Sequence, residues 1–373
     1  MTEISLLTLF VAIASALPGN LPAYRGPPHV PHGGGDGDGY SNWDLAEFKT
    51  LVSFGDSYTD DSRLKYFGAN GGQAPPPGWD NPPNNASASG GYTWTDYVAW
   101  YTGAKRYNYA VSGAECSDEI TPRYLESIGA NFPTVKEYEV PAWIADTQVI
   151  EPDGTKFFSG EAESTVYSMW IGTNDLGQAA LLTDSQVLGT NITTYIDCVY
   201  SQLKRIYDNG ARYFVLQNVI PLQLTPLYAT PANGGVVDDH YWPTKPANVT
   251  EVSYRMMEQV ATTNAVYKYR TPFELLVAKE MPEARVAVMD MYQLILDIYN
   301  NPTEYLNGTA PANVTSYNNH CTADGSQCVQ STSPDSFLWY DELHPSEQTD
   351  RIIARNFVDV VHGESKYATY WSS

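Results

Sequence analysis

Short apolar runs alternate with longer amphipathic stretches along most of the chain. The runs are rich in β-branched and aromatic residues, which favours strands, whereas the stretches between them have helical periodicity. This alternation predicts an α/β fold in which helices cover a parallel sheet. The predicted strands are 51–54, 107–111, 165–171, 213–219 and 286–289.

Two helices are predicted most clearly. In residues 192–206, apolar side chains recur at intervals of four and three, and Gly210 follows as a C-terminal cap. A second apolar stripe, 352–361, follows Pro345. We expect both stripes to face the core.

The ends of the chain differ in character from its middle. Residues 1–16 contain an apolar stretch that ends in Ala-Ser-Ala, which predicts a signal peptide and secretion; a buried N-terminal strand or helix is the alternative. Residues 17–47 are rich in Gly and Pro and predict a flexible arm or pro-segment. We expect one folded domain over 48–363 and a tail over 364–373. No later segment approaches the ~20 apolar residues of a membrane span.

The charge of the chain narrows its range of partners. Among 373 residues, 43 are acidic and 21 are basic, for a formal net charge of -22. This charge repels phosphate backbones and anionic head groups, so we expect neither nucleic acid nor an acidic membrane as a partner.

Four cysteines allow up to two disulfides in a secreted chain. Cys321 and Cys328 are close enough in sequence to close one loop, which would leave Cys116 with Cys198; free buried thiols are the alternative. No Cys or His spacing predicts a metal site. Glycosylation sequons fit the secretory route, although an Asn-, Ser- and Thr-rich chain produces some by chance; they lie at Asn85, Asn191, Asn248, Asn307 and Asn313.

A serine stands where the first predicted strand ends. The strand ends at Gly55, the chain turns through Asp56, and we expect Ser57 to begin a helix. Its backbone N–H and a helix N-terminus would then stabilise developing negative charge at the sheet edge. Taken alone, a serine that only caps a helix is the stronger interpretation.

A histidine near the C-terminus can supply the base that such a serine needs. An imidazole with a pKa near ~6.5 suits proton transfer at ordinary pH. Asp341 stands three residues before His344 on a turn stiffened by Pro345, so its carboxylate can reach the far ring nitrogen and hold the tautomer. A surface turn is the alternative.

Two other predicted strands lead to N–H donors. Gly113 follows the strand 107–111 and can offer a backbone N–H, and Asn174 follows the strand 165–171 and can offer a side-chain N–H. Both could hold the same oxyanion. Considered singly, Gly113 is better explained as a turn glycine, and Asn174 as a loop amide whose hydrogen bonds are satisfied within the protein.

A segment dense in Gly, Pro and Asn, 67–91, cannot form a regular helix. It follows the first strand, so we expect it at the carboxyl edge of the sheet, where open α/β folds bind ligands. One interpretation makes Trp79, Tyr92 and Trp94 a substrate rim, and the other makes them ordinary aromatic contacts of a loop.

Together and in this order, four segments resemble the blocks of the GDSL or SGNH hydrolases, which are named for motifs carrying Ser, Gly, Asn and His. Tyr58 stands in place of the family's common Leu. The matching segments are 55–58, 108–113, 171–175 and 341–345.

This resemblance implies a three-layer, flavodoxin-like fold with a five-stranded parallel sheet. It implies Ser57 as nucleophile, His344 as base and Asp341 as the partner of that base. The oxyanion donors would be the Ser57 N–H, Gly113 and Asn174. No cofactor or metal is required.

Within the family, the secretion signal, the Pro- and Asn-rich insertion and the acidic composition look most like fungal acetylesterases of carbohydrate esterase family sixteen. This likeness implies a secreted esterase that deacetylates short or partly degraded plant polysaccharide chains. We expect the protein to be a monomer. The alternatives are a secreted lipase or phospholipase with a longer-chain preference, and a catalytically silent carbohydrate-binding protein on the same fold.

Overall fold

The computed structural model describes residues 43–237, 239–322 and 324–373. The predicted signal peptide, 1–16, and most of the predicted arm, 17–47, lie outside the described residues. No helix within the described ranges is long and apolar enough to cross a membrane.

The central sheet has the strand order β12-β7-β6-β5-β1-β2. Its parallel strands are β1 (Thr50–Gly55), β2 (Lys105–Asn108), β5 (Thr165–Trp170), β6 (Tyr213–Gln217) and β7 (Arg285–Met289). Counted along the chain, the spatial order of these five is 2-1-3-4-5, the flavodoxin-like order. The predicted α/β class and its five parallel strands are confirmed.

The sheet has a sixth strand that the sequence did not predict. Residues 364–373 are not a simple tail, because β12 (Ala368–Ser372) pairs antiparallel with β7. Its aromatic side chains suit an edge strand, and Tyr370 packs against Trp43 with ring centroids 5.7 Å apart. Trp43 Nε1 also donates to Val361 O at 2.6 Å, so the folded unit begins before the predicted boundary at Phe48.

The strand β2 ends earlier than predicted. β2 is the last strand on its side of the sheet, and Ala110 N donates to a local acceptor, Asn108 Oδ1, at 3.1 Å. The residues that follow stay buried beside β1, since Tyr109 N donates to Ser53 O at 2.8 Å.

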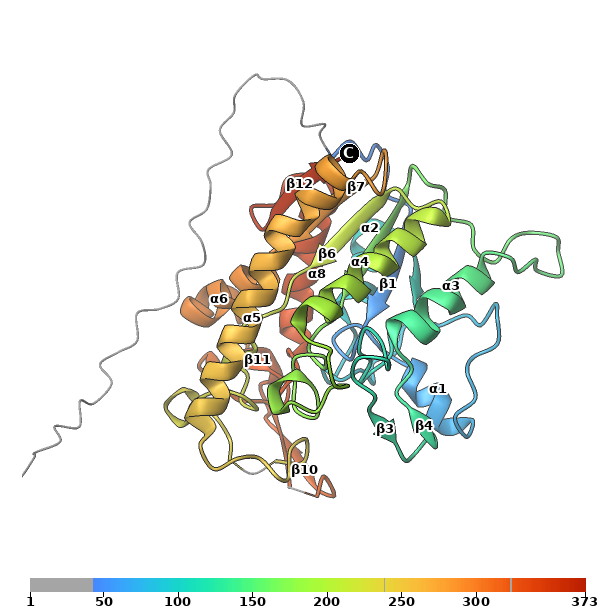
Figure 1. The fold of residues 1–373 in the computed structure, drawn as a ribbon. Coiled ribbons are helices and arrows are strands. Elements are labelled where there is room, and N and C mark those ends of the chain that lie inside the picture. Colours follow the sequence, from blue (N-terminus) through green and yellow to red (C-terminus); the bar gives the residue numbers. More distant parts are fainter. Residues whose placement is uncertain (1–42, 238, 323) are drawn as a thin grey trace, which may run out of the picture. The chain divides into compact units, whose positions relative to one another are not determined.

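Helices cover both faces of the sheet (Figure 1). The front layer in that view contains α3 (Val140–Asp146), α4 (Ile192–Asp208) and α5 (Val249–Pro272), and the layer behind contains α2 (Trp94–Thr102) and α8 (Glu347–Val361). The apolar stripes of α4 and α8 are buried, so both predicted helices are confirmed.

Shorter elements surround this sandwich. The remaining helices are α1 (Arg63–Ala69), α6 (Met291–Asn300) and α7 (Pro302–Tyr305). Three two-stranded sheets pair β3 (Tyr124–Leu125) with β4 (Ala130–Asn131), β8 (Asn313–Tyr317) with β11 (Phe337–Trp339), and β9 (Asn319–Cys321) with β10 (Cys328–Gln330).

Both proposed disulfide pairs are present. Cys116–Cys198 joins the loop after β2 to α4, and Cys321–Cys328 joins β9 to β10. Of the sequon residues, Asn313 is half-buried and the other four are exposed. Their glycosylation stays a prediction.

Candidate active site

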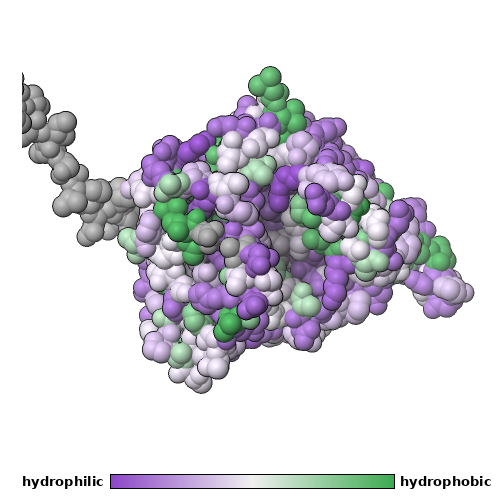
Figure 2. Space-filling view, turned by 90° about the horizontal axis from the view of Figure 1, so that it is seen from below, coloured by the Kyte–Doolittle hydropathy of each residue, from purple (hydrophilic) through white to green (hydrophobic). Residues whose placement is uncertain are grey.

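Three loops that carry predicted site residues meet at one edge of the sheet. β1 lies between β2 and β5, and all three strands are parallel. The loops with Ser57, Gly113 and Asn174 therefore leave the carboxyl ends of neighbouring strands and lie side by side. Figure 2 views the molecule from this end, and the surface is hollowed near its middle. Open α/β sheets bind ligands at such an edge.

Ser57 lies in a tight turn and not at the start of a helix. Thr59 N and Asp60 N both donate to Asp56 O, at 3.0 and 2.9 Å, which closes the turn. The first helix begins only at Arg63, so the predicted helix N-terminus at Ser57 is wrong. The close approach of β1 to β5 requires Gly55, since a Cβ there would lie 2.2 Å from Trp170 O.

Folding brings Ser57, His344 and Asp341 into one hydrogen-bonded chain. His344 Nε2 lies 2.8 Å from Ser57 Oγ, and His344 Nδ1 lies 2.9 Å from each carboxylate oxygen of Asp341. The backbone N–H groups of Leu343 and His344 donate to Asp341 Oδ1 at 2.9 and 2.7 Å. All three side chains are buried, with Ser57 8% exposed. Such a chain can move a proton from a hydroxyl to an imidazole.

The turn that carries Asp341 and His344 connects β11 to α8. Tyr340 N donates to His344 O at 2.7 Å across this turn. Tyr58 Oη donates to Leu343 O at 3.0 Å, and its ring stands nearly perpendicular to the imidazole at 5.8 Å. The sequence pattern identified Tyr58 only as a departure from the family's Leu. In the structure it ties the turn to the loop of Ser57.

A second tyrosine contacts the same turn from a distant segment. Tyr241 lies between β6 and α5, and its Oη donates to Asp341 Oδ2 at 2.7 Å. No motif in the sequence pointed to this residue. The available signal for Tyr241 was its position next to His240 in the sequence, and such a pair is not specific enough to identify a site residue.

Charge and burial act against each other on the pKa values of this pair. Burial lowers the pKa of His344, but the Asp341 carboxylate and its hydrogen bond outweigh burial, so the net pKa lies above its ordinary value. Burial raises the pKa of Asp341, but the charge and hydrogen bonds of His344 hold it below its ordinary value. Burial raises the pKa of Asp56, behind Ser57, to about 6.

Gly113 and Asn174 offer N–H groups near Ser57. Gly113 has φ of +83°, and a Cβ there would lie 2.2 Å from the Phe132 ring, so only glycine fits without rearrangement. Asn174 Nδ2 donates to Ala114 O at 2.9 Å, which uses one of its two hydrogens and orients the amide. Asp60 Oδ2 accepts from Ser112 N at 2.8 Å and holds the loop in place.

The predicted aromatic rim is only partly compatible with the structure. Trp94 is fully buried and packs on Phe357 at 4.8 Å, so its assignment to a substrate rim is wrong. It faces inward because helix α2, which it begins, packs on α8. Trp79 and Tyr92 are half-buried; Trp79 contacts the Tyr66 ring at 5.1 Å, and Tyr92 contacts Trp100.

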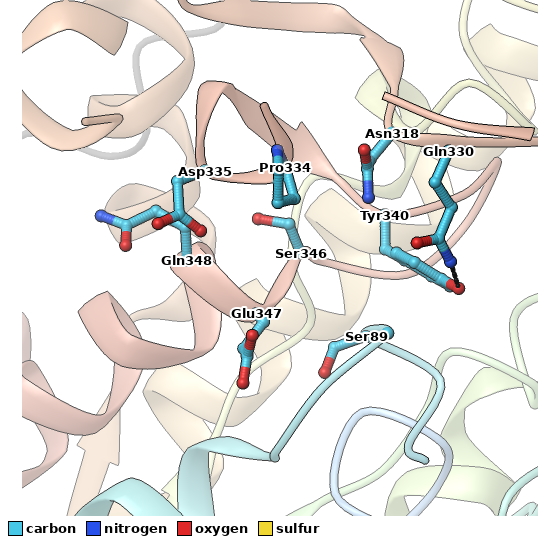
Figure 3. Close-up of a pocket in the computed structure, with 10 residues that line it drawn as sticks. Ser89, Asn318, Gln330, Pro334, Asp335, Tyr340, Ser346, Glu347 and Gln348 are labelled. Carbon is cyan, nitrogen blue, oxygen red and sulfur yellow. Dashed lines mark hydrogen bonds between the residues drawn. The ribbon is translucent and has the colours of Figure 1, made fainter. Parts of the chain in front are cut away.

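Two hollows are lined by residues that neighbour site residues in sequence, although neither is lined by Ser57, His344 or Asp341. An open groove of about 520 Å³ is lined by Ser112, next to Gly113, by α1 and by Ala86 to Ala88. A smaller cavity of about 90 Å³ lies between Ser89, Tyr340 and Glu347, where Gln330 Nε2 donates to Tyr340 Oη at 2.9 Å (Figure 3). Within the described part of the chain, no group of three or more His, Cys, Asp or Glu side chains could hold a metal ion.

The chain is similar to several known proteins. The family described as GDSL-like Lipase/Acylhydrolase matches residues 51–357. An acetylesterase from Hypocrea jecorina is 45% identical over 328 residues, which are 87% of this chain and 92% of that protein. An acetylesterase from Thermothelomyces thermophilus is 26% identical over 84% of this chain and 89% of its own length. A solved acetylxylan esterase from Geobacillus stearothermophilus is 14% identical, with a TM-score of 0.37, over 85% of this chain and 96% of that one.

Proposed function

Because this chain belongs to the GDSL-like lipase/acylhydrolase family and is a carboxylic ester hydrolase, we propose that it uses Ser57 as nucleophile, His344 as general base and Asp341 as the partner of that base. The observation that carries the proposal is the continuous chain of hydrogen bonds, 2.8 Å from Ser57 Oγ to His344 Nε2 and 2.9 Å from His344 Nδ1 to Asp341. A serine hydroxyl becomes a competent nucleophile when a neighbouring base takes its proton.

The proposed reaction is acyl transfer in two steps. Ser57 Oγ attacks the ester carbonyl while His344 Nε2 takes the hydroxyl proton, and the resulting imidazolium gives that proton to the leaving alcohol. Water, deprotonated by the same nitrogen, then attacks the acyl-serine ester, and the acid leaves as Ser57 recovers its proton. Asp341 holds the tautomer with hydrogen on Nδ1 and stabilises the charged ring.

The negative oxygen of each tetrahedral intermediate needs donors that are already in place. We assign this role to the Ser57 N–H, the Gly113 N–H and the second hydrogen of Asn174 Nδ2. Support comes from the shared sheet edge and from the bond of Asn174 to Ala114 O at 2.9 Å, which leaves one amide hydrogen to donate.

The proposed substrates are short-chain esters, above all acetyl esters on plant cell-wall oligosaccharides, met outside the cell. The similarity to two fungal acetylesterases supports the acetyl group. The open groove beside Gly113 supports a bulky alcohol, since small side chains such as Ser87 and Ser112 line it. Two disulfides fit an oxidising compartment and so support secretion.

Ester turnover by a Ser57→Ala variant tests the mechanism. Loss of the nucleophile should lower kcat by about 10³-fold to 10⁶-fold. Ser201→Ala is the matched control, because Ser201 Oγ bonds to its neighbours on α4, where it donates to Cys198 O at 2.7 Å and accepts from Gln202 Nε2 at 2.9 Å. Retained activity in Ser57→Ala would refute the assignment.

A series of acetyl, butyryl and long-chain p-nitrophenyl esters tests the acyl preference. In a short acyl pocket each added methylene should lower kcat/KM by an amount that corresponds to about 1 to 3 kcal/mol of activation free energy. Rising kcat/KM with chain length would instead support a lipase, and sugar binding that survives in Ser57→Ala without any esterase activity in the wild type would support a binding protein.

A further inference from the structure

The Asp341 carboxylate receives a donor from outside its own turn. Leu343 N, His344 N and His344 Nδ1 all belong to the segment that carries Asp341. Tyr241 lies 100 positions away in sequence, and its Oη donates to Asp341 Oδ2 at 2.7 Å. The tyrosine ring also packs beside the imidazole, with centroids 5.7 Å apart. The hydroxyl and the ring therefore contact both partners of the acid-base pair.

The segment that carries Tyr241 makes backbone contacts to two other parts of the site. Gln178 Nε2 donates to Tyr241 O at 3.0 Å, and Gln178 lies on the loop that carries Asn174. Leu227 N, earlier in the same segment as Tyr241, donates to Glu342 O at 2.7 Å. The segment thus contacts both the Asn174 loop and the Asp341 turn, which anchors the backbone of Tyr241 between them.

The phenol of Tyr241 keeps its proton and can therefore always donate its hydrogen bond to Asp341. Burial, and then the charge of Asp341, raise the pKa of the Tyr241 phenol far above its ordinary range. The titratable groups around this phenol and His344 come from three segments of the chain: Asp56 and Tyr58, His240, and Tyr340, Asp341 and Glu342.

We infer that Tyr241 is a positioning residue of the ester hydrolysis, which fixes the Asp341 carboxylate and withdraws part of its charge from His344. The inference rests on the proposed roles of Asp341 and His344. A hydrogen bond to one carboxylate oxygen stops the group from rotating about its Cβ–Cγ bond, so the other contacts keep the imidazole aimed at Ser57 Oγ. The same bond spreads the negative charge, which weakens its pull on the imidazolium.

Tyr241→Phe removes the hydroxyl and keeps the ring. We expect kcat/KM for p-nitrophenyl acetate to fall by about tenfold, mostly through kcat, because the hydroxyl donates to Asp341 and acts through that carboxylate. With more carboxylate charge facing it, His344 should bind its proton more tightly, so the ascending limb of the pH profile should move up by about 0.5 pH unit.

Tyr228→Phe is the matched control, from the same segment. Tyr228 Oη accepts from Gln178 N at 3.2 Å and thus anchors the segment, and within the described residues it makes no hydrogen bond to Asp341 or His344. Its ascending limb should stay at the wild-type pH. If both variants lose activity equally and neither limb moves, Tyr241 only supports the segment and the inference fails.

A double-mutant cycle with Asp341→Asn separates this inference from the proposed function. If Tyr241 acts through Asp341, adding Tyr241→Phe to Asp341→Asn should change kcat/KM by less than about twofold. Losses that multiply in full would overturn the inference. Full esterase activity in Asp341→Asn alone would overturn the proposed role of Asp341 itself. Low activity in Asp341→Asn together with full activity in Tyr241→Phe would overturn only the role of Tyr241.

A spectroscopic measurement gives a second readout that does not depend on turnover. The chemical shift of the His344 ring protons should titrate at a higher pH in the folded Tyr241→Phe variant than in the wild-type protein, and at the wild-type pH in the Tyr228→Phe variant. A His344 titration that is the same in every folded variant would contradict the inference without any turnover measurement.

Discussion

The two sides of the site are held in different ways. Gly113 and Asn174 each stand a few residues after the end of a parallel strand, and Asn174 is held by its bond to the Ala114 carbonyl. The turn of Asp341 and His344 connects β11 to α8, outside the central sheet, and side-chain hydroxyls tie it to the rest of the site. Sheet topology therefore positions the proposed oxyanion donors, whereas individual side-chain contacts position the proposed base.

Among the changes that separate the two sides, the one with the largest expected effect alters the sheet side alone. Asn174→Ala should lower kcat by about 10²-fold to 10³-fold, the usual cost of one oxyanion donor. Because the base is untouched, the ascending limb of the pH profile should keep its position. Asn209→Ala is the control, since Asn209 Nδ2 donates to Arg205 O at 2.9 Å on the exposed end of α4. A displaced limb in Asn174→Ala would mean that the two sides are not separable.

The pH profile sharpens the other side of the comparison. His344 must be neutral to accept the Ser57 proton, and its pKa is raised because Asp341 outweighs burial. The ascending limb of kcat/KM should thus lie above the ordinary ~6.5, with a tenfold loss per pH unit below it. In Asp341→Asn the limb should move to lower pH. A wild-type limb well below pH 6 would contradict this account.

The smallest effect concerns the tie between the turn and the loop of Ser57. Tyr58→Phe removes the bond to Leu343 O, so kcat/KM should fall several-fold and stability by about 1 kcal/mol. Tyr207→Phe removes a similar bond, from Tyr207 Oη to Pro282 O at 2.9 Å, far from the turn. Thermal unfolding should show comparable losses in both variants, and only Tyr58→Phe should lose turnover. Equal kcat/KM in the two variants would show that Tyr58 does not hold the turn for catalysis.

Most of the secondary structure near the site followed from local patterns. The five parallel strands and the helices α4 and α8 were predictable because apolar periodicity is local and these elements face one core. The match over 51–357 confirms the resemblance to the family. The sequence could reveal this resemblance because each of the family's motifs is short and contiguous. The helix expected at Ser57 was wrong because a turn closed on Asp56 O satisfies the same backbone groups.

The sequence by itself determined the α/β class, the family and the residue types of the site, because each depends on neighbouring positions. Tertiary structure alone decided that Trp94 is buried, that 368–372 forms an edge strand, and that Tyr58 and Tyr241 contact the turn of Asp341 and His344. These outcomes depend on which surfaces meet after the chain folds. A tyrosine 100 positions from its partner in sequence carries no local sign of that contact.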